Sequence, residues 1–244
     1  MFKREVVEDI AIIKLNRPEQ ANALNRELFL GLTKELEVMK RRDDIRVVIF
    51  TGEGEKAFCA GIDLKERAQK GNDEIFLERK EVIRPFYLTL GDFPKPTIAA
   101  LNGLTLGGGA ELALACDIRM ASNSAKFGQT EIKWGMIPSC GACQRLRVIT
   151  GVSVAKEIIF TGRVLEAEEA HRLGIYNYLI PKEDLMWKAI DLAKEIAENS
   201  PVAVRQAKKV LDIGPDISRA LDFEFEASTE CFVVGDALSK SKSF

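Results

Sequence analysis

The sequence has one histidine, His171, among 244 residues. Serine hydrolases of the α/β type carry a Gly-x-Ser-x-Gly turn and a histidine partner, and that turn does not occur in this sequence. Cysteine–histidine catalysis would need His171 beside Cys59 or Cys140, which the sequence alone leaves open. A structural zinc is not expected, because the single CxxC pair, Cys140 and Cys143, has no second pair and the histidine is distant in sequence.

Long apolar runs and a leader segment are also missing. No stretch approaches the ~20 apolar residues that span a bilayer, and residues 1–5 show no apolar leader. We therefore expect a cytoplasmic enzyme, or one of an organelle matrix, with no membrane partner. Five cysteines form an odd set, which argues against a disulfide framework. We interpret Cys140 and Cys143 as small buried thiols near a tight turn rather than a redox pair.

The composition is that of an ordinary globular protein. Hydrophobic residues make up 46% and charged residues 30%, and the length suits one large α/β domain or two small ones. The net charge of −2 gives no general attraction to nucleic acid or anionic lipid.

Hydrophobic periodicity predicts alternating strands and helices over the first ~125 residues. This alternation is typical of an α/β fold whose parallel strands are buried between helices. The strands are expected at 5–15 as a hairpin, 47–52, 97–101 and 118–121, and the helices at 25–39 behind an Asn25 N-cap, 73–91 and 107–116.

The pattern changes at about residue 140, where helical segments dominate. They are expected at 153–161, 166–173, 184–199, 201–213 and 216–234, with a strand-like interruption at 176–180. We predict an α/β core over 1–183 and a C-terminal helical region over 184–244.

The glycines Gly107, Gly108 and Gly109 come just before a predicted helix. A helix N-terminus has unpaired N–H groups and a positive dipole end, and glycines let a ligand approach that backbone closely. The run is neither a Walker A loop nor a GxGxxG fingerprint. We expect an oxyanion pocket, although a tightly packed turn accounts for the glycines alone at least as well.

Two carboxylates accompany this run. Glu111 falls in the first turn of the predicted helix, where the helix dipole already favours it. Glu131 follows 20 positions later, and an exposed strand-end carboxylate paired with Lys133 is its plainer interpretation. Two carboxylates beside one electrophile can divide acid and base roles if their environments separate their pKa values. Ala60 offers a second exposed amide.

Taken together, seven motifs resemble the crotonase, or enoyl-CoA hydratase/isomerase, superfamily, and they cover nearly the whole chain. They are Asn-Arg-Pro at 16–18 with Asn-Ala-Leu-Asn at 22–25, Ala-Phe-Cys-Ala-Gly-Ile-Asp-Leu at 57–64, the run 94–112 that ends in Leu-Gly-Gly-Gly-Ala-Glu-Leu, Cys-Asp-Ile-Arg at 116–119, Phe-Gly-Gln-Thr-Glu at 127–131, Gln-Arg-Leu at 144–146 and Phe-Thr-Gly-Arg at 160–163.

The resemblance implies a crotonase-like spiral of strand-strand-helix repeats, assembled as a homotrimer or a dimer of trimers through the C-terminal helices. It implies an acyl-CoA thioester substrate and no cofactor beyond the coenzyme A of that substrate. By position, the N–H groups of Ala60 and Gly108 look like the oxyanion hole. Residues implied to contact the substrate are Gln20, Ala21, Ala23, Ala60, Gly61, Ile62, Asp63, Leu64, Gly108 and Trp134.

Glu111 and Glu131 stand at the positions of the hydratase's two catalytic carboxylates. An enoyl-CoA hydratase is therefore predicted, in which Glu111 deprotonates the water that attacks the β-carbon and Glu131 supplies the α-proton. An isomerase or another crotonase-type lyase is the nearest alternative. A non-catalytic CoA- or RNA-binding paralogue is a further one, for which the small basic cluster of Arg205, Lys208 and Lys209 is a weak signal. We expect no nucleic-acid partner.

The sequence departs from common hydratases at 138–143. Pro-Ser-Cys-Gly-Ala-Cys stands where they carry Pro-Gly-x-Gly-Gly, which bears on the acyl-chain preference. Trp134 is expected to shorten or reshape the acyl pocket. The chain ends at Phe244, short of the family's usual basic tail, and we expect any closure of that tail over a neighbour's CoA to be weakened.

Overall fold

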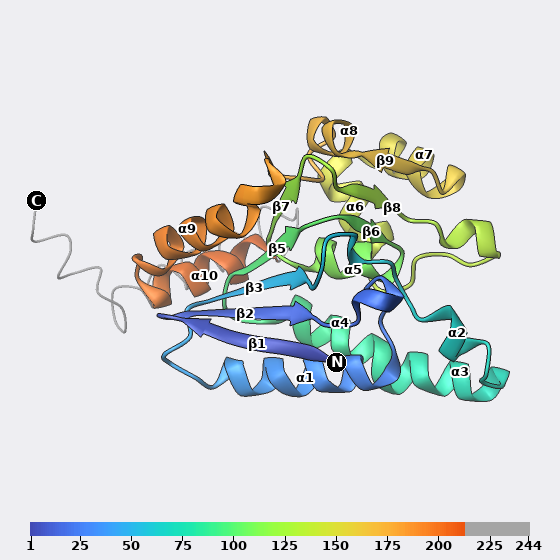
Figure 1. The fold of residues 1–244 in the computed structure, drawn as a ribbon, viewed down its shortest axis with the longest axis horizontal. Coiled ribbons are helices and arrows are strands. Elements are labelled where there is room, and N and C mark those ends of the chain that lie inside the picture. Colours follow the sequence, from blue (N-terminus) through green and yellow to red (C-terminus); the bar gives the residue numbers. More distant parts are fainter. Residues whose placement is uncertain (213–244) are drawn as a thin grey trace, which may run out of the picture.

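A computed structural model describes residues 1–212, which form two sheets and the helices around them (Figure 1). The larger sheet has six strands, in the order β1 (Phe2–Val7), β2 (Ile10–Leu15), β3 (Val47–Gly52), β5 (Thr97–Leu101), β7 (Ile118–Ser122) and β10 (Tyr178–Ile180). Within this sheet, as described over residues 1–212, only the β1–β2 pair is antiparallel. The smaller sheet contains β4 (Ala57–Cys59), β6 (Leu104–Leu106), β8 (Lys126–Gly128) and β9 (Val164–Glu166).

The two sheets arise from a repeated unit. The first strand of each unit, β3, β5 or β7, joins the larger sheet, and the next strand, β4, β6 or β8, joins the smaller one. Successive units stack in parallel within both sheets. This is the spiral of strand-strand-helix turns that the family resemblance implies.

Helices cover both faces of the larger sheet. They are α1 (Arg26–Lys40), α2 (Leu64–Arg67), α3 (Asn72–Glu78), α4 (Arg84–Gly91), α5 (Gly108–Ala115), α6 (Ala142–Thr150), α7 (Val152–Thr161), α8 (Ala167–Arg172), α9 (Leu185–Ala197) and α10 (Pro201–Leu211), with short turns η1 (Pro18–Gln20), η2 (Arg79–Ile83), η3 (Glu131–Trp134) and η4 (Lys182–Asp184). The expected N-cap is present, because the Asn25 side chain accepts a hydrogen bond from the Leu28 N–H at 3.0 Å.

The larger sheet is buried on both faces because its strands are apolar at successive positions. Ile10 and Ile12 of β2 face one way and pack with α9, whereas Ala11 and Ile13 face the other way into the main core. That main core also contains the apolar faces of α1, α4 and α5. Helix α1 lies on one side of the sheet and α9 on the other (Figure 1).

The helix predicted over 73–91 is interrupted. Helices α3 and α4 are joined by the π-helical turn η2, in which the Arg84 N–H donates to the Arg79 carbonyl. Pro85 follows immediately and has no N–H to donate, so regular α-helical bonding cannot continue through it. The periodicity of the apolar side chains persists across this turn, which is why the sequence reads as one helix.

Several short elements were not predicted. Strands β4, β6, β8 and β9 have three residues each, too few to show a period, and helix α6 was missed between two glycines. The strand expected over 176–180 is shorter, because β10 covers only Tyr178–Ile180.

The helix expected over 216–234, Cys231 and the chain end lie outside the described residues. The domain boundary at 184 stays a prediction. Within residues 1–212, no helix combines the length and apolarity needed to cross a membrane.

Candidate active site

The start of helix α5 is shaped by its glycines. Gly107 adopts φ 50° and ψ −123°, a conformation that L side chains rarely adopt. A Cβ on Gly109 would lie 2.2 Å from the Cys59 carbonyl oxygen, so only glycine allows α5 to pack this closely on β4. The turn leaves the Gly108 N–H at the first helical position, where no intrahelical acceptor exists.

The two predicted carboxylates line one cavity of about 550 Å³. Glu111 comes from the first turn of α5, and Glu131 opens η3. Gly108 of α5, Ile62 from the loop after β4 and Cys140 from the loop before α6 line the same cavity. The fold therefore brings together the glycine run and both glutamates, as predicted.

Glu111 is held by backbone donors. Its side chain is buried, with 4% exposure, and Oε1 accepts a 2.6 Å hydrogen bond from the Cys140 N–H. Burial raises the pKa of Glu111, while hydrogen bonds from the Cys140 and Ala142 N–H groups act in the opposite direction. These hydrogen bonds fix the orientation of the carboxyl group and favour its ionised form.

Glu131 has a different environment. Burial, and to a smaller degree the charge of Glu111, raise its pKa to about 7. The buried Gln129 carboxamide faces this group, and we assign the orientation in which its nitrogen donates to Oε1 at 3.1 Å and Oε2 at 3.0 Å. Gln129 was not predicted as a site residue. The two carboxyl groups thus lie in different environments, because a backbone N–H binds Glu111 and a side-chain amide faces Glu131. Different environments are the condition for separate acid and base roles.

The prediction that the Ala60 N–H is the second oxyanion donor is wrong. The Ala60 N–H donates to the Ala21 carbonyl at 3.0 Å and so is not available to a ligand. The N–H of Ile62 has no acceptor among residues 1–212, and Ile62 lines the cavity beside Gly108: a Cβ on Gly108 would lie 3.2 Å from Ile62 Cδ1. Ile62 and Gly108 therefore present the pair of free N–H groups.

The start of α5 is also anchored from α4. The buried Tyr87 hydroxyl donates a 2.6 Å hydrogen bond to the Gly108 carbonyl. The Tyr87 ring packs edge-on against Phe86, with ring centroids 5.0 Å apart. Tyr87 thereby fixes the peptide unit that follows the free Gly108 N–H, a role that no sequence pattern indicated.

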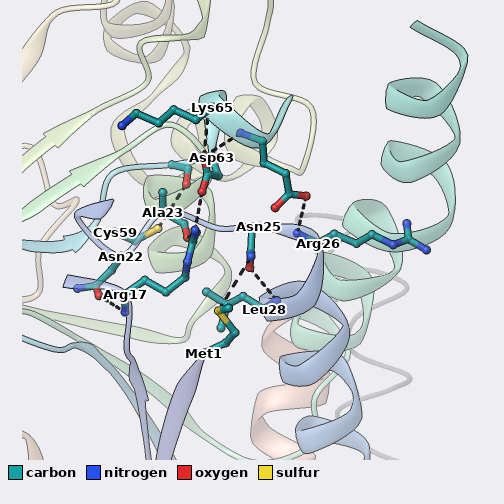
Figure 2. A network of polar contacts seen from close by, with 12 residues as sticks. Met1, Arg17, Asn22, Ala23, Asn25, Arg26, Leu28, Cys59, Asp63 and Lys65 are labelled. Atoms are coloured by element: carbon teal, nitrogen blue, oxygen red, sulfur yellow. Dashed lines mark hydrogen bonds and ion pairs between the residues drawn. The ribbon is translucent and has the colours of Figure 1, made fainter. Parts of the chain in front are cut away.

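The two segments that contain most of the residues implied to contact the substrate, 20–24 and 60–64, lie side by side. The Leu24 N–H donates to the Gly61 carbonyl at 2.7 Å, and the Asp63 N–H donates to the Leu24 carbonyl at 2.9 Å. Arg17 pairs with Asp63 at 2.6 Å and also donates to the Ala23 carbonyl, as Figure 2 shows. Asp63 further caps α2 through the Lys65 and Glu66 N–H groups, at 3.1 Å each. The Asp63 carboxylate therefore holds the segment 60–64 against Arg17 and the start of α2.

Trp134 is not brought into the cavity. Its side chain is 66% exposed, and the cavity is lined instead by the residues that follow it, Gly135, Met136 and Ile137. Of the two thiols, Cys140 lines the cavity. Four cationic side chains that the sequence did not single out line it as well: Arg67, Arg79, Lys80 and Arg84.

The alternatives left open by the sequence gain no support. Burial raises the pKa of Cys59 and Cys140 to about 12, which disfavours a reactive thiolate. His171 Nδ1 lies 2.9 Å from the Tyr176 carbonyl. Lys208 of the basic cluster is engaged with Asp117 at 2.8 Å and with the Lys95 carbonyl at 3.1 Å. No group of three or more metal-binding side chains occurs within residues 1–212.

The sequence matches the family model described as enoyl-CoA hydratase/isomerase over residues 5–234. A putative enoyl-CoA hydratase/isomerase of Bacillus subtilis is 42% identical, covering 97% of this chain and 92% of that protein. A short-chain-enoyl-CoA hydratase of Clostridium acetobutylicum is 38% identical, with 96% and 90% covered. The human mitochondrial methylglutaconyl-CoA hydratase is 41% identical over 85% of this chain and 62% of its own length.

Solved structures agree with these sequence matches. An enoyl-CoA hydratase from Bacillus anthracis superposes with a TM-score of 0.96 at 40% identity, covering 100% of this chain and 95% of that one. An enoyl-CoA hydratase subunit from Geobacillus kaustophilus gives a TM-score of 0.93 at 33% identity, covering 100% and 94%. The predicted spiral fold is confirmed.

Proposed function

Because the chain belongs to the enoyl-CoA hydratase/isomerase family, we propose that it is a hydratase that adds water reversibly across the 2,3 double bond of an enoyl-CoA thioester. The observation that carries this proposal is the pair of carboxyl groups in one cavity, Glu111 and Glu131, with different environments. Adding water requires a base for the water and an acid for the α-carbon, and two such groups can fill both roles.

The thioester is the electrophile in this mechanism. Its oxygen accepts hydrogen bonds from the Ile62 and Gly108 N–H groups, which hold the negative charge as the enolate forms. The Gly108 donor lies at a helix N-terminus, where the dipole adds to the effect. Donors fixed in place before the reaction need no reorganisation, and one such donor is typically worth about 10²–10³ in rate.

The two carboxyl groups act at the two different carbons of the double bond. Glu111, oriented by the Cys140 N–H, positions the water and removes its proton as the oxygen attacks the β-carbon. Glu131, whose pKa is raised to about 7, delivers a proton to the α-carbon of the enolate. The coenzyme A is part of the substrate, and the mechanism uses no further cofactor.

An isomerase is the alternative within the family. A double-bond shift can proceed with one carboxylate that shuttles a proton, so retention of both groups favours hydration. The relatives' names differ on the acyl group, since one specifies a short-chain enoyl-CoA and another methylglutaconyl-CoA. Product analysis separates the reactions. A hydratase forms the 3-hydroxyacyl-CoA from a 2-enoyl-CoA, whereas conversion of a 3-enoyl-CoA to its 2-isomer without hydration would indicate an isomerase.

We further propose a homotrimer or a dimer of trimers in the cytoplasm, joined through the C-terminal helical region. A binding-only protein is disfavoured because the site retains both carboxyl groups. The mass of the assembly in solution, measured by light scattering, tests the oligomer: three or six copies are expected, and a monomer would contradict it.

A further inference from the structure

The cavity that holds the two glutamates also has a cationic wall, formed by Arg67, Arg79, Lys80 and Arg84. Within residues 1–212, none of these four side chains forms an ion pair or donates a hydrogen bond. The nearby carboxylates of Glu66 and Glu78 are both bound by Lys70, at 2.5 and 2.7 Å, and the charge of Glu78 also acts on Arg67. Arg79, Lys80 and Arg84 therefore present cationic groups that have no ion-pair partner among residues 1–212.

The backbone places two of these cations, Arg79 and Arg84, on adjacent helical turns. Arg79 and Arg84 bracket the π-turn η2, and the Arg84 N–H donates to the Arg79 carbonyl. This bond joins successive turns, so the two residues lie one above the other on the helix. The interruption before Pro85 thus brings two guanidinium groups to the same cavity, and π-turns of this kind occur frequently at functional sites.

Arg79 and Arg84 line the cavity near Cys140. Arg84 also lines an adjoining cavity of about 340 Å³ together with Ser139 and Cys140, and the charge of Arg79 acts on the Cys140 thiol. Cys140 is the residue bonded to Glu111. An acyl chain whose thioester sits at Ile62 and Gly108 and whose β-carbon reaches Glu111 therefore continues toward Arg79 and Arg84.

We infer that the acyl group of the substrate ends in a carboxylate, as in the enoyl-CoA of a dicarboxylic acid, and that Arg79 and Arg84 bind that carboxylate. The inference rests on the proposed function and specifies its substrate class. Apolar side chains that line the same cavity, among them Phe76, Met136 and Ile137, can enclose the acyl chain itself. A planar guanidinium matches a terminal carboxylate through two parallel hydrogen bonds. The CoA phosphates are the other anionic groups of such a substrate, and the experiment separates the two sources.

The first arm compares two five-carbon substrates, glutaconyl-CoA and 2-pentenoyl-CoA, which differ in the terminal carboxylate. We expect the wild type to prefer glutaconyl-CoA in kcat/KM by about 10-fold or more, since hydrogen bonds to charged groups contribute about that factor each. Arg79→Gln and Arg84→Gln should each lower kcat/KM for glutaconyl-CoA by about 10- to 100-fold and leave 2-pentenoyl-CoA within about threefold. Arg41→Gln, an equal charge change at an exposed residue outside the cavity, should alter neither.

The second arm removes the phosphates. The same acyl groups are presented as pantetheine thioesters, and the preference for the carboxylate and its loss in both variants should persist. Effects of equal size on glutaconyl-CoA and 2-pentenoyl-CoA that vanish with pantetheine thioesters would assign the two arginines to the CoA phosphates and overturn the inference.

A third arm measures binding without turnover, by calorimetry with glutaryl-CoA and pentanoyl-CoA. Tighter binding of glutaryl-CoA, lost in both arginine variants, is expected. Equal dissociation constants would overturn the inference even if 2-pentenoyl-CoA is hydrated, in which case the hydratase proposal stands. Selective binding of glutaryl-CoA without hydration of any enoyl-CoA would instead overturn the hydratase proposal. Circular dichroism of each variant confirms that it is folded.

Discussion

The Cys140 N–H donates a 2.6 Å hydrogen bond to Oε1 of Glu111, and this bond joins the first turn of α5 to the loop before α6. The loop is held in turn by Arg145, whose Nη1 donates to the Cys140 carbonyl at 3.0 Å. Cys140 therefore links Arg145 to the proposed base, because its carbonyl accepts from Arg145 and its N–H donates to Glu111. The departure from the common hydratase motif at 138–143 retains this backbone donor.

Arg145 should act as a positioning residue. Replacing it with glutamine frees the Cys140 carbonyl and loosens the donor to Glu111, so we expect kcat for enoyl-CoA hydration to fall about 10-fold while KM changes less than threefold. Arg147→Gln provides a matched control on the exposed side of the same helix and should leave both constants unchanged. Equal kinetics for the two variants would exclude this role.

The pH profile should report the two carboxyl groups. Glu131 must be protonated to act as the acid, and its pKa is about 7, so the hydration rate should decline as the pH rises through about 7. Glu111 must be ionised, and burial raises its pKa, so the acidic limb should lie above the range of an ordinary glutamate. The profile of kcat/KM from pH 4 to 9 checks both limbs. A rate that stays constant between pH 6 and 9 would contradict the assignment of Glu131.

The raised pKa of Glu131 should also make the stability of the folded protein depend on pH. The folded-state pKa of Glu131 is raised above its value in the unfolded chain, so this group's contribution is fully present below about pH 4.5 and is lost as the pH rises through about 7. Glu131→Gln should therefore raise Tm at pH 8 by about 2–4 °C and change it little at pH 4. Thermal scans at both values test this. Glu19→Gln, at an exposed position, is the control, and an equal gain in both variants would speak against burial of Glu131 as the cause.

Gly109 should tolerate no side chain. A Cβ there would lie 2.2 Å from the Cys59 carbonyl oxygen and 2.7 Å from Cys59 Cβ, so Gly109→Ala must push α5 away from β4 and should cost about 2–4 kcal/mol in the free energy of unfolding. Gly71→Ala is the matched control, because nothing lies within 4 Å of its Cβ, and it should stay within about 0.5–1 kcal/mol of the wild type. Urea denaturation measures both. Similar unfolding free energies for both variants would contradict this packing.

Much of the fold was predictable because the sequence patterns that indicate its strands and helices are local. Strands such as β3 and β5 are continuous apolar runs between helices, and Asn25 marks a helix start through its own side chain. The glycine run and Glu111 lie on a single turn, so their proximity follows from the chain itself. That Glu131 reaches the same cavity followed from the family resemblance, since no local pattern connects residues 20 positions apart.

The errors arise where distant segments decide the outcome. Ala60 and Ile62 are near neighbours in an irregular loop, and pairing with residues 21–24 consumes the Ala60 N–H and leaves that of Ile62 free. Three residues of the cationic wall, Arg79, Lys80 and Arg84, lie in or next to the π-turn η2, which interrupts a helix that was predicted to be continuous. Trp134 was placed by its proximity in sequence to Glu131, yet the turn η3 directs it to solvent. The spacing of residues in the sequence alone does not determine the orientation of any of these groups.

The central claim is that Glu111 and Glu131 perform hydration together, and the rate of crotonyl-CoA hydration by Glu111→Gln and Glu131→Gln tests it most directly. Both substitutions keep the size of the side chain and remove its acid–base function. The account predicts that each lowers kcat by about 10²–10⁴ while the variants stay folded and bind the thioester. Rates close to the wild type in both variants would contradict it.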